Sequence, residues 1–172
     1  MRTEVVSFTG ASGHPLSGRL DLPIGRVRAT ALFAHCFSCG KDLKSVKELT
    51  SRLTGHGFAV LRFDFTGLGQ SEGDFADTHF GTNVDDLVVA ADWLRQSYAP
   101  PALLVGHSLG GAAAIVAAGR IPELAGVATI GAPSDPAHVA HLFDDSALAT
   151  LAEGKDDPVE ASIAGRSFSV HG

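Results

Sequence analysis

Residues 106–110 read Gly-His-Ser-Leu-Gly and match the pattern G-x-S-x-G. An apolar run precedes them and an alanine-rich stretch follows, which predicts a sharp turn from a buried strand into a helix. A serine on such a turn adopts an unfavourable backbone conformation, and glycines on either side avoid collisions. Its hydroxyl then stands clear of the sheet, and the helix amides favour a developing negative charge. Ser108 is therefore the candidate nucleophile and Leu109 a candidate backbone donor to an oxyanion; the alternative is a tight glycine turn with an incidental serine.

The second candidate oxyanion donor is the backbone amide of Phe37. In sites of this kind one amide follows the nucleophile, and the other comes from the loop after the third strand. Residues 34–40, Ala-His-Cys-Phe-Ser-Cys-Gly, end an apolar run and precede a helical pattern, as that loop requires. We expect His35 to be a structural hydrogen-bonding residue. His107 is expected to point beneath the turn, where it is a poor base.

Cys36 and Cys39 have C-x-x-C spacing, which admits two interpretations. In a cytosolic protein the pair can be a redox couple at a strand-to-helix junction. The other interpretation is two small apolar side chains on a loop. A redox function leaves the turn at Ser108 unexplained. The sequence shows no metal-ligand spacing and no complete nucleotide-binding glycine loop, so we expect neither a metal nor a cofactor.

Candidates for the base and the acid lie downstream of residue 131. His138, with His141 and His171 as further choices, is the candidate general base, and Asp135 the candidate acid. The alternative for each histidine is a solvated side chain on a surface helix.

The elements that must position these residues are predicted from hydrophobic periodicity. Alternation in residues 4–8 and 16–22, around turn residues 10–15, predicts an antiparallel hairpin. Helical spacing follows in residues 46–53, in a segment opening with a capping-box shape at Thr82–Asp85, and in residues 111–119. Nearly continuous apolar runs are typical of strands in a parallel sheet, and they occupy residues 29–34, 58–63, 102–105 and 126–130. The fold class is therefore α/β.

Together these segments resemble the N-terminal part of the α/β-hydrolase fold, from about Thr3 to Pro133. The His-Cys-Phe form of residues 35–37 resembles the hydrolase domains fused to an OsmC-like domain in bacterial proteins. The resemblance implies that Ser108 is the nucleophile and that the amides of Leu109 and Phe37 form the oxyanion hole. It also implies that Asp64 stabilises the following glycine turn and takes no part in catalysis.

The chain departs from the family pattern after residue 131. A strand-helix-strand unit takes roughly 30 residues or more, and residues 137–151 instead show an amphipathic helical pattern after a Ser-Asp-Pro helix start. We therefore expect a hydrolase core in residues 1–133 that lacks the last strands of the family, with a cap-like helix and tail in residues 134–172. We therefore expect the family's usual positions for the triad acid and histidine to be absent from this chain.

Composition excludes several classes of function. The 172 residues carry a net charge of −6, which argues against binding to nucleic acid phosphates. The longest apolar run is too short to span a membrane, and an acid at Glu4 replaces the apolar stretch of a secretory signal, so we expect a cytoplasmic protein.

The sequence thus predicts a carboxylesterase-type serine hydrolase that forms an acyl-enzyme on Ser108 with small or medium acyl esters. The alternatives are a truncated, catalytically weak scaffold for binding, or a thiol redox protein that uses Cys36 and Cys39. Residues 127–130 are expected to form a strand with a bare edge, which predicts a homodimer built around it.

Overall fold

The computed structural model describes residues 1–36, 39–135, 159–163 and 166–170. Its strands are β1 (Arg2–Thr9), β2 (Pro15–Leu22), β3 (Ala29–Ala34), β4 (Phe58–Phe63), β5 (Leu103–His107), β6 (Gly126–Ile130), β7 (Val159–Ile163) and β8 (Arg166–Val170). Its helices are α1 (Lys44–Gly55), α2 (Phe80–Ser97) and α3 (Leu109–Ala118), with a short 3₁₀ turn η1 at Phe75–Asp77.

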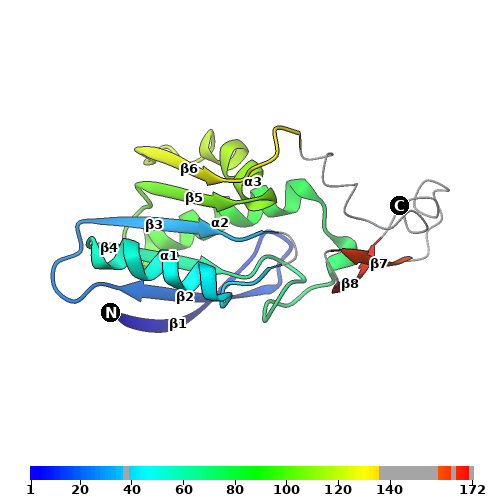
Figure 1. The fold of residues 1–172 in the computed structure, drawn as a ribbon, viewed down its shortest axis with the longest axis horizontal. Helices are drawn as coiled ribbons and strands as arrows, with labels where there is room; N and C mark the ends of the chain where they lie inside the picture. The colour runs from blue at the N-terminus through cyan, green and yellow to red at the C-terminus, as the bar shows by residue number, and fades with distance from the viewer. Residues whose placement is uncertain (37–38, 136–158, 164–165, 171–172) are drawn as a thin grey trace.

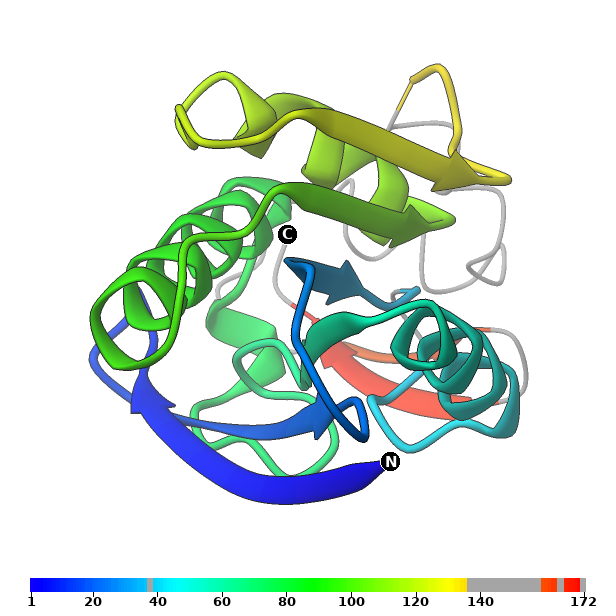
Figure 2. The ribbon, with the colours of Figure 1, turned by 90° about the vertical axis from the view of Figure 1, so that its left-hand side faces the viewer.

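Six strands form one mixed sheet in the order β1-β2-β4-β3-β5-β6. β1, β2 and β4 pair antiparallel, whereas β4, β3, β5 and β6 run parallel. Helix α1 covers one face of the sheet, and α2 and α3 cover the other (Figures 1 and 2). The predicted α/β class, the N-terminal hairpin and the four apolar strands are confirmed.

The core is made where the apolar strands meet the helices. Leu32, Leu61 and Leu104, on three neighbouring parallel strands, are fully buried in one cluster with Leu87 and Leu94 of α2. Helix α3 contributes only small side chains to this cluster, the fully buried Ala113, Ala114 and Ala117. Because alanine keeps the helix axis close to the sheet, the backbone at the start of α3 reaches the ends of β3 and β5.

The start of α2 differs from the sequence prediction. The capping-box shape at Thr82–Asp85 predicts that the helical segment opens at Thr82, but α2 begins at Phe80. The Thr82 hydroxyl accepts a hydrogen bond from the backbone N–H of His79, 3.2 Å away. Thr82 thus closes the cap from inside the first turn, and His79 is the N-cap.

Beyond β6, strands β7 and β8 pair antiparallel as a separate two-stranded sheet. This hairpin lies past the carboxyl ends of the parallel strands (Figure 1), where β8 contacts η1. The predicted helix at 137–151 lies outside the described residues. Within the described part of the chain, no helix has the length and apolar character needed to cross a bilayer.

Candidate active site

Ser108 sits on the turn between β5 and α3. Its backbone has φ 54° and ψ −127°, and it is the one residue other than glycine with positive φ in the described ranges. The turn is held because the Ser108 N–H donates to the carbonyl of Ile130, 2.8 Å away, at the end of β6. The Ser108 side chain makes no capping hydrogen bond to α3, so its hydroxyl is not used to start the helix.

Glycines make this turn possible by close backbone approach. A β-carbon at Gly106 would lie 2.5 Å from the carbonyl oxygen of Gly110 and from the α-carbon of Gly111. A β-carbon at Gly110 would overlap the carbonyl oxygen of His35. Real β-carbons do not make such contacts, so the two glycines of the G-x-S-x-G pattern are sterically required.

Leu109 is the first residue of α3, and its side chain is buried. The first hydrogen bond that closes α3 is made by the N–H of Gly111 to the Ser108 carbonyl, 2.8 Å away. The N–H of Leu109 therefore precedes the intrahelical ladder, as the first amides of any helix do. Because the dipole of α3 is positive at this end, the Leu109 N–H is suited to donate a hydrogen bond to an oxyanion.

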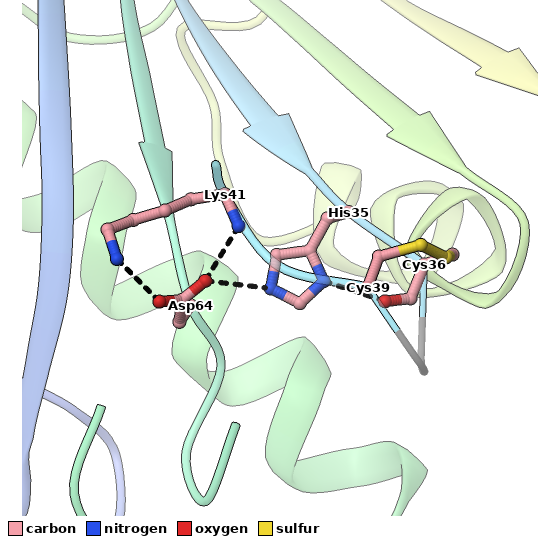
Figure 3. The surroundings of a disulfide bond; sticks show 5 residues. All are labelled: His35, Cys36, Cys39, Lys41 and Asp64. Atoms are coloured by element: carbon pink, nitrogen blue, oxygen red, sulfur yellow. Dashed lines mark hydrogen bonds and ion pairs between the residues drawn. A yellow bond between two sulfur atoms is a disulfide. The ribbon is translucent and has the colours of Figure 1, made fainter. Parts of the chain in front are cut away.

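The loop after β3 contains His35, Cys36 and Cys39. The two cysteines form a disulfide with their α-carbons 5.1 Å apart (Figure 3). His35 is 1% exposed and its Nδ1 donates to the Cys36 carbonyl, 2.7 Å away. Burial lowers the pKa of His35, which keeps the ring neutral and fits the structural role expected of it. Phe37 lies outside the described residues.

Asp64 and Lys41 form a buried ion pair that supports this loop. Asp64 Oδ1 accepts the backbone N–H of Lys41 at 2.7 Å, and Oδ2 accepts Lys41 Nζ at 2.6 Å. Oδ2 also accepts the N–H of Gln70, 2.9 Å away, in the glycine turn after β4. Figure 3 shows the Asp64 carboxylate between the Lys41 side chain and the His35 ring, with His35 Nε2 3.7 Å from Oδ1. Asp64 thus ties the loop after β3 to the loop after β4.

Sequence reasoning missed Lys41. A lysine just before a helix is expected to be solvated, yet this side chain is 1% exposed. The one sequence signal for a paired Lys41 is its place just before a helix. Positive charge near a helix N-terminus is unfavourable unless a carboxylate compensates it.

The candidate acid lies within the described residues, and the candidate base does not. Asp135 is exposed and follows β6 by several residues, and His138 lies outside the described ranges. The described histidines include His35, which is buried and directed at the Cys36 carbonyl and Asp64, and His107, which lies beside the cysteine pair. No side chain of residues 1–36 or 39–135 hydrogen-bonds to the Ser108 hydroxyl.

One group of side chains in the described residues can hold a metal ion. A ligand atom of each of Cys36, Cys39 and His107 lies within 4.8 Å of the other two. The sequence predicts no metal site, because His107 is far from the cysteines along the chain and joins them only through strand pairing.

Comparison with known sequences identifies the family of this chain. The family model described as serine aminopeptidase, S33, matches residues 25–154. Human monoglyceride lipase is 33% identical over 117 residues, which cover 67% of this chain and 38% of the lipase. An uncharacterised protein of Rickettsia prowazekii is 37% identical over 149 residues, 84% of this chain and 60% of that protein. This chain therefore spans less than two thirds of the length of these curated relatives, 38% of the first and 60% of the second.

Comparison with solved structures agrees with this family match. The esterase domain of a Rhodothermus marinus protein has a TM-score of 0.74 and 45% identity, covering 99% of this chain and 65% of that one. An α/β serine hydrolase without a lid from Xanthomonas campestris has a TM-score of 0.68 and 28% identity, covering 78% and 63%. From the family match, the strand order and the turn at Ser108, the chain belongs to the serine aminopeptidase S33 family and has the α/β-hydrolase fold.

Proposed function

We propose that this chain is a serine hydrolase of the carboxylesterase type that cleaves small or medium acyl esters through an acyl-enzyme on Ser108. The observation that carries the proposal is the backbone of Ser108, with φ 54° at the start of α3. Such conformations persist only where the surroundings enforce them, and they cluster at functional sites. The esterase and lipase names of the relatives support ester chemistry.

The proposed mechanism follows from this placement. The Ser108 oxygen attacks the ester carbonyl carbon, and its proton passes to His138, which Asp135 orients. The N–H groups of Leu109 and Phe37 donate to the oxyanion of the tetrahedral intermediate. Collapse expels the alcohol, which takes the proton from His138, and water then hydrolyses the acyl-enzyme by the same route.

Hydrolysis of p-nitrophenyl esters of increasing acyl length tests the proposal. Ser108→Ala is expected to reduce turnover to background, while Ser51→Ala, at an exposed position on α1, is the matched control. A fluorophosphonate probe is expected to label Ser108 and no other serine. Turnover or labelling that survives in Ser108→Ala would refute the assignment.

The two alternatives give different results in the same assays. A binding scaffold would remain folded and would show neither turnover nor a fluorophosphonate adduct. A thiol redox protein would reduce the disulfides of insulin in the presence of a dithiol, and Ser108→Ala would keep that activity.

The Phe37 amide is tested by removing its hydrogen. Phe37→Pro lacks the backbone N–H and is expected to lower kcat by about 10²–10³, the usual effect of losing one oxyanion donor. Phe37→Leu keeps the N–H and is expected to lose far less. Equal losses in the two variants would mean that the side chain matters and the amide does not.

The base is tested with a pair of histidines from the same segment. His138→Ala is expected to abolish turnover, whereas His141→Ala is expected to retain most of it. The reverse result would assign the base to His141. Asp135→Asn is expected to lower kcat without changing the fold, because a carboxylate there only orients the histidine.

We further propose kinship with the hydrolase domains that are fused to OsmC-like domains, supported by the His-Cys-Phe sequence of residues 35–37.

The proposed assembly is a homodimer through β6. This strand is the outer strand of the sheet beside β5, and its Val127 and Ile130 are 39% and 47% exposed. The cytoplasmic location expected from the sequence stays a prediction.

A further inference from the structure

The disulfide after β3 lies next to a histidine from a neighbouring strand. β3 and β5 pair in parallel, with Ala34 opposite Gly106, so the residues that follow each strand emerge at the same edge of the sheet. Cys36 follows β3 closely, His107 is the last residue of β5, and Cys39 is brought back to Cys36 by a backbone hydrogen bond of 3.0 Å. The three ligand atoms lie within 4.8 Å of one another.

We propose that the reduced forms of Cys36 and Cys39 bind Zn²⁺ together with His107. Thiolate and imidazole are the ligands that Zn²⁺ prefers, at about 2.3 Å for sulfur and about 2.0–2.1 Å for nitrogen. Two ligand atoms on one tetrahedral ion are therefore about 3.5 Å apart. The observed cluster needs only small movements to reach that geometry, because the cysteine α-carbons are 5.1 Å apart and all three ligand atoms lie within 4.8 Å of one another.

Metal binding requires reduction first, and the two steps balance. The Cys36–Cys39 disulfide takes up two electrons and two protons from a dithiol, which is oxidised to its own disulfide. Zn²⁺ then displaces the two thiol protons and binds both thiolates and a neutral His107. In the oxidised chain the sulfur atoms are bonded to each other, so the oxidised chain offers only the imidazole. A reducing compartment, where disulfides are rare, would favour the thiol form.

The surroundings favour a metal ligand set over a thioredoxin-like redox couple. A helix N-terminus is one setting that activates a redox cysteine, but α1 begins at Lys44, several residues after Cys39. Cys36 is 9% exposed, which hinders attack on the disulfides of other proteins. His107 places a third ligand atom beside the two cysteines, which gives the three protein ligands of an open zinc site.

An ion at this position would join the two segments that carry the proposed oxyanion donors. Cys36 and Cys39 flank Phe37 on one side, and His107 precedes Ser108 on the other. The site itself does not depend on the proposed esterase activity. Its test therefore uses metal binding rather than turnover.

Co²⁺ and Zn²⁺ titrations of the full chain test the proposal. The chain is reduced with a phosphine that is then removed, and Co²⁺ is expected to give thiolate charge-transfer absorption that saturates at one equivalent. Zn²⁺ should displace the Co²⁺, and its affinity is measured by competition with a chromophoric chelator. The oxidised chain should bind at least about 10²-fold more weakly, because two of three ligands are lost. Equal binding by the reduced and oxidised chains would overturn the proposal.

The histidine is tested separately from the cysteines. His107→Ala is expected to weaken Zn²⁺ binding at least tenfold, since even loss of an outer-shell partner costs about 10–100-fold. His56→Ala, at an exposed histidine that caps α1, is the matched control and should bind as the parent does. Unchanged affinity in His107→Ala would remove it from the ligand set.

Zinc-edge X-ray absorption of the unmodified chain gives an answer even if His107→Ala does not fold. Two sulfur ligands and at least one imidazole nitrogen are expected. Four sulfur ligands would mean that cysteine pairs from two chains share the ion, and nitrogen or oxygen ligands alone would mean adventitious binding. Either result overturns the three-ligand site.

Discussion

The carbonyl oxygen of His35 lies against the α-carbon of Gly110, with no room for a side chain between them. This contact docks the first turn of α3 on the end of β3 through backbone atoms alone. The loop after β3 and the turn at Ser108 are thereby fixed relative to each other. A site that uses amides from both segments depends on that contact.

Substitution of the elbow glycines is the direct test of this docking. Gly106→Val and Gly110→Val are each expected to lower soluble yield and the melting temperature sharply, because the added β-carbons meet backbone atoms that cannot move aside. Gly126→Val, in β6 with open space around its α-carbon, is the control and should melt normally. Normal melting of both elbow variants would show that the sharp turn does not form.

The strained backbone of Ser108 predicts an unusual order of stability for two substitutions at this position. Both Ser108→Ala and Ser108→Gly should lack turnover, but φ 54° is unstrained for glycine and strained for alanine, as it is for the native serine. The glycine variant should therefore be the more stable of the two, by roughly 1–3 kcal/mol in urea unfolding.

The matched pair at Ser51 is expected to show the opposite order. Ser51 is exposed in the interior of α1, where glycine is about 1 kcal/mol less favourable than alanine. If Ser108→Gly were also less stable than Ser108→Ala, the positive φ of the native turn would be contradicted.

Removing Lys41 should expose how much the buried pair supports the loop after β3. Lys41→Met leaves the Asp64 carboxylate buried without its cation, and loss of one partner of a buried pair costs about 3–5 kcal/mol. Lys44→Met removes an exposed lysine nearby and is expected to change the unfolding free energy by less than about 0.5 kcal/mol. Equal stability of the two variants in urea would show that Asp64 does not need Lys41.

The parallel sheet and the elbow could be predicted because their signals are local. Apolar runs such as residues 58–63 are nearly continuous because both faces of β4 are covered, and the elbow is set by glycines within two residues of Ser108. A short motif that fixes its own backbone conformation can be read without the rest of the fold.

The missed features depend on partners that are distant in the chain. Lys41 is buried only because Asp64, after a different strand, accepts its hydrogen bonds. His107 reaches the cysteine pair only because β5 lies beside β3. The partnership of His107 leaves no pattern in the surrounding residues, and that of Lys41 leaves only a lysine just before a helix, so sequence periodicity could not reveal them.

The proposed dimer makes the last prediction. β6 is an outer strand of the sheet, and exposed apolar edge strands tend to pair with another chain. The chain is expected to sediment as a dimer at micromolar concentration, and Val127→Lys should shift it to a monomer, because a lysine on the edge opposes strand pairing. Val5→Lys places the same charge on β1, the opposite edge, where Val5 is 77% exposed, and should remain dimeric. A monomeric parent would refute the dimer, and loss of the dimer in Val5→Lys alone would move the interface to β1.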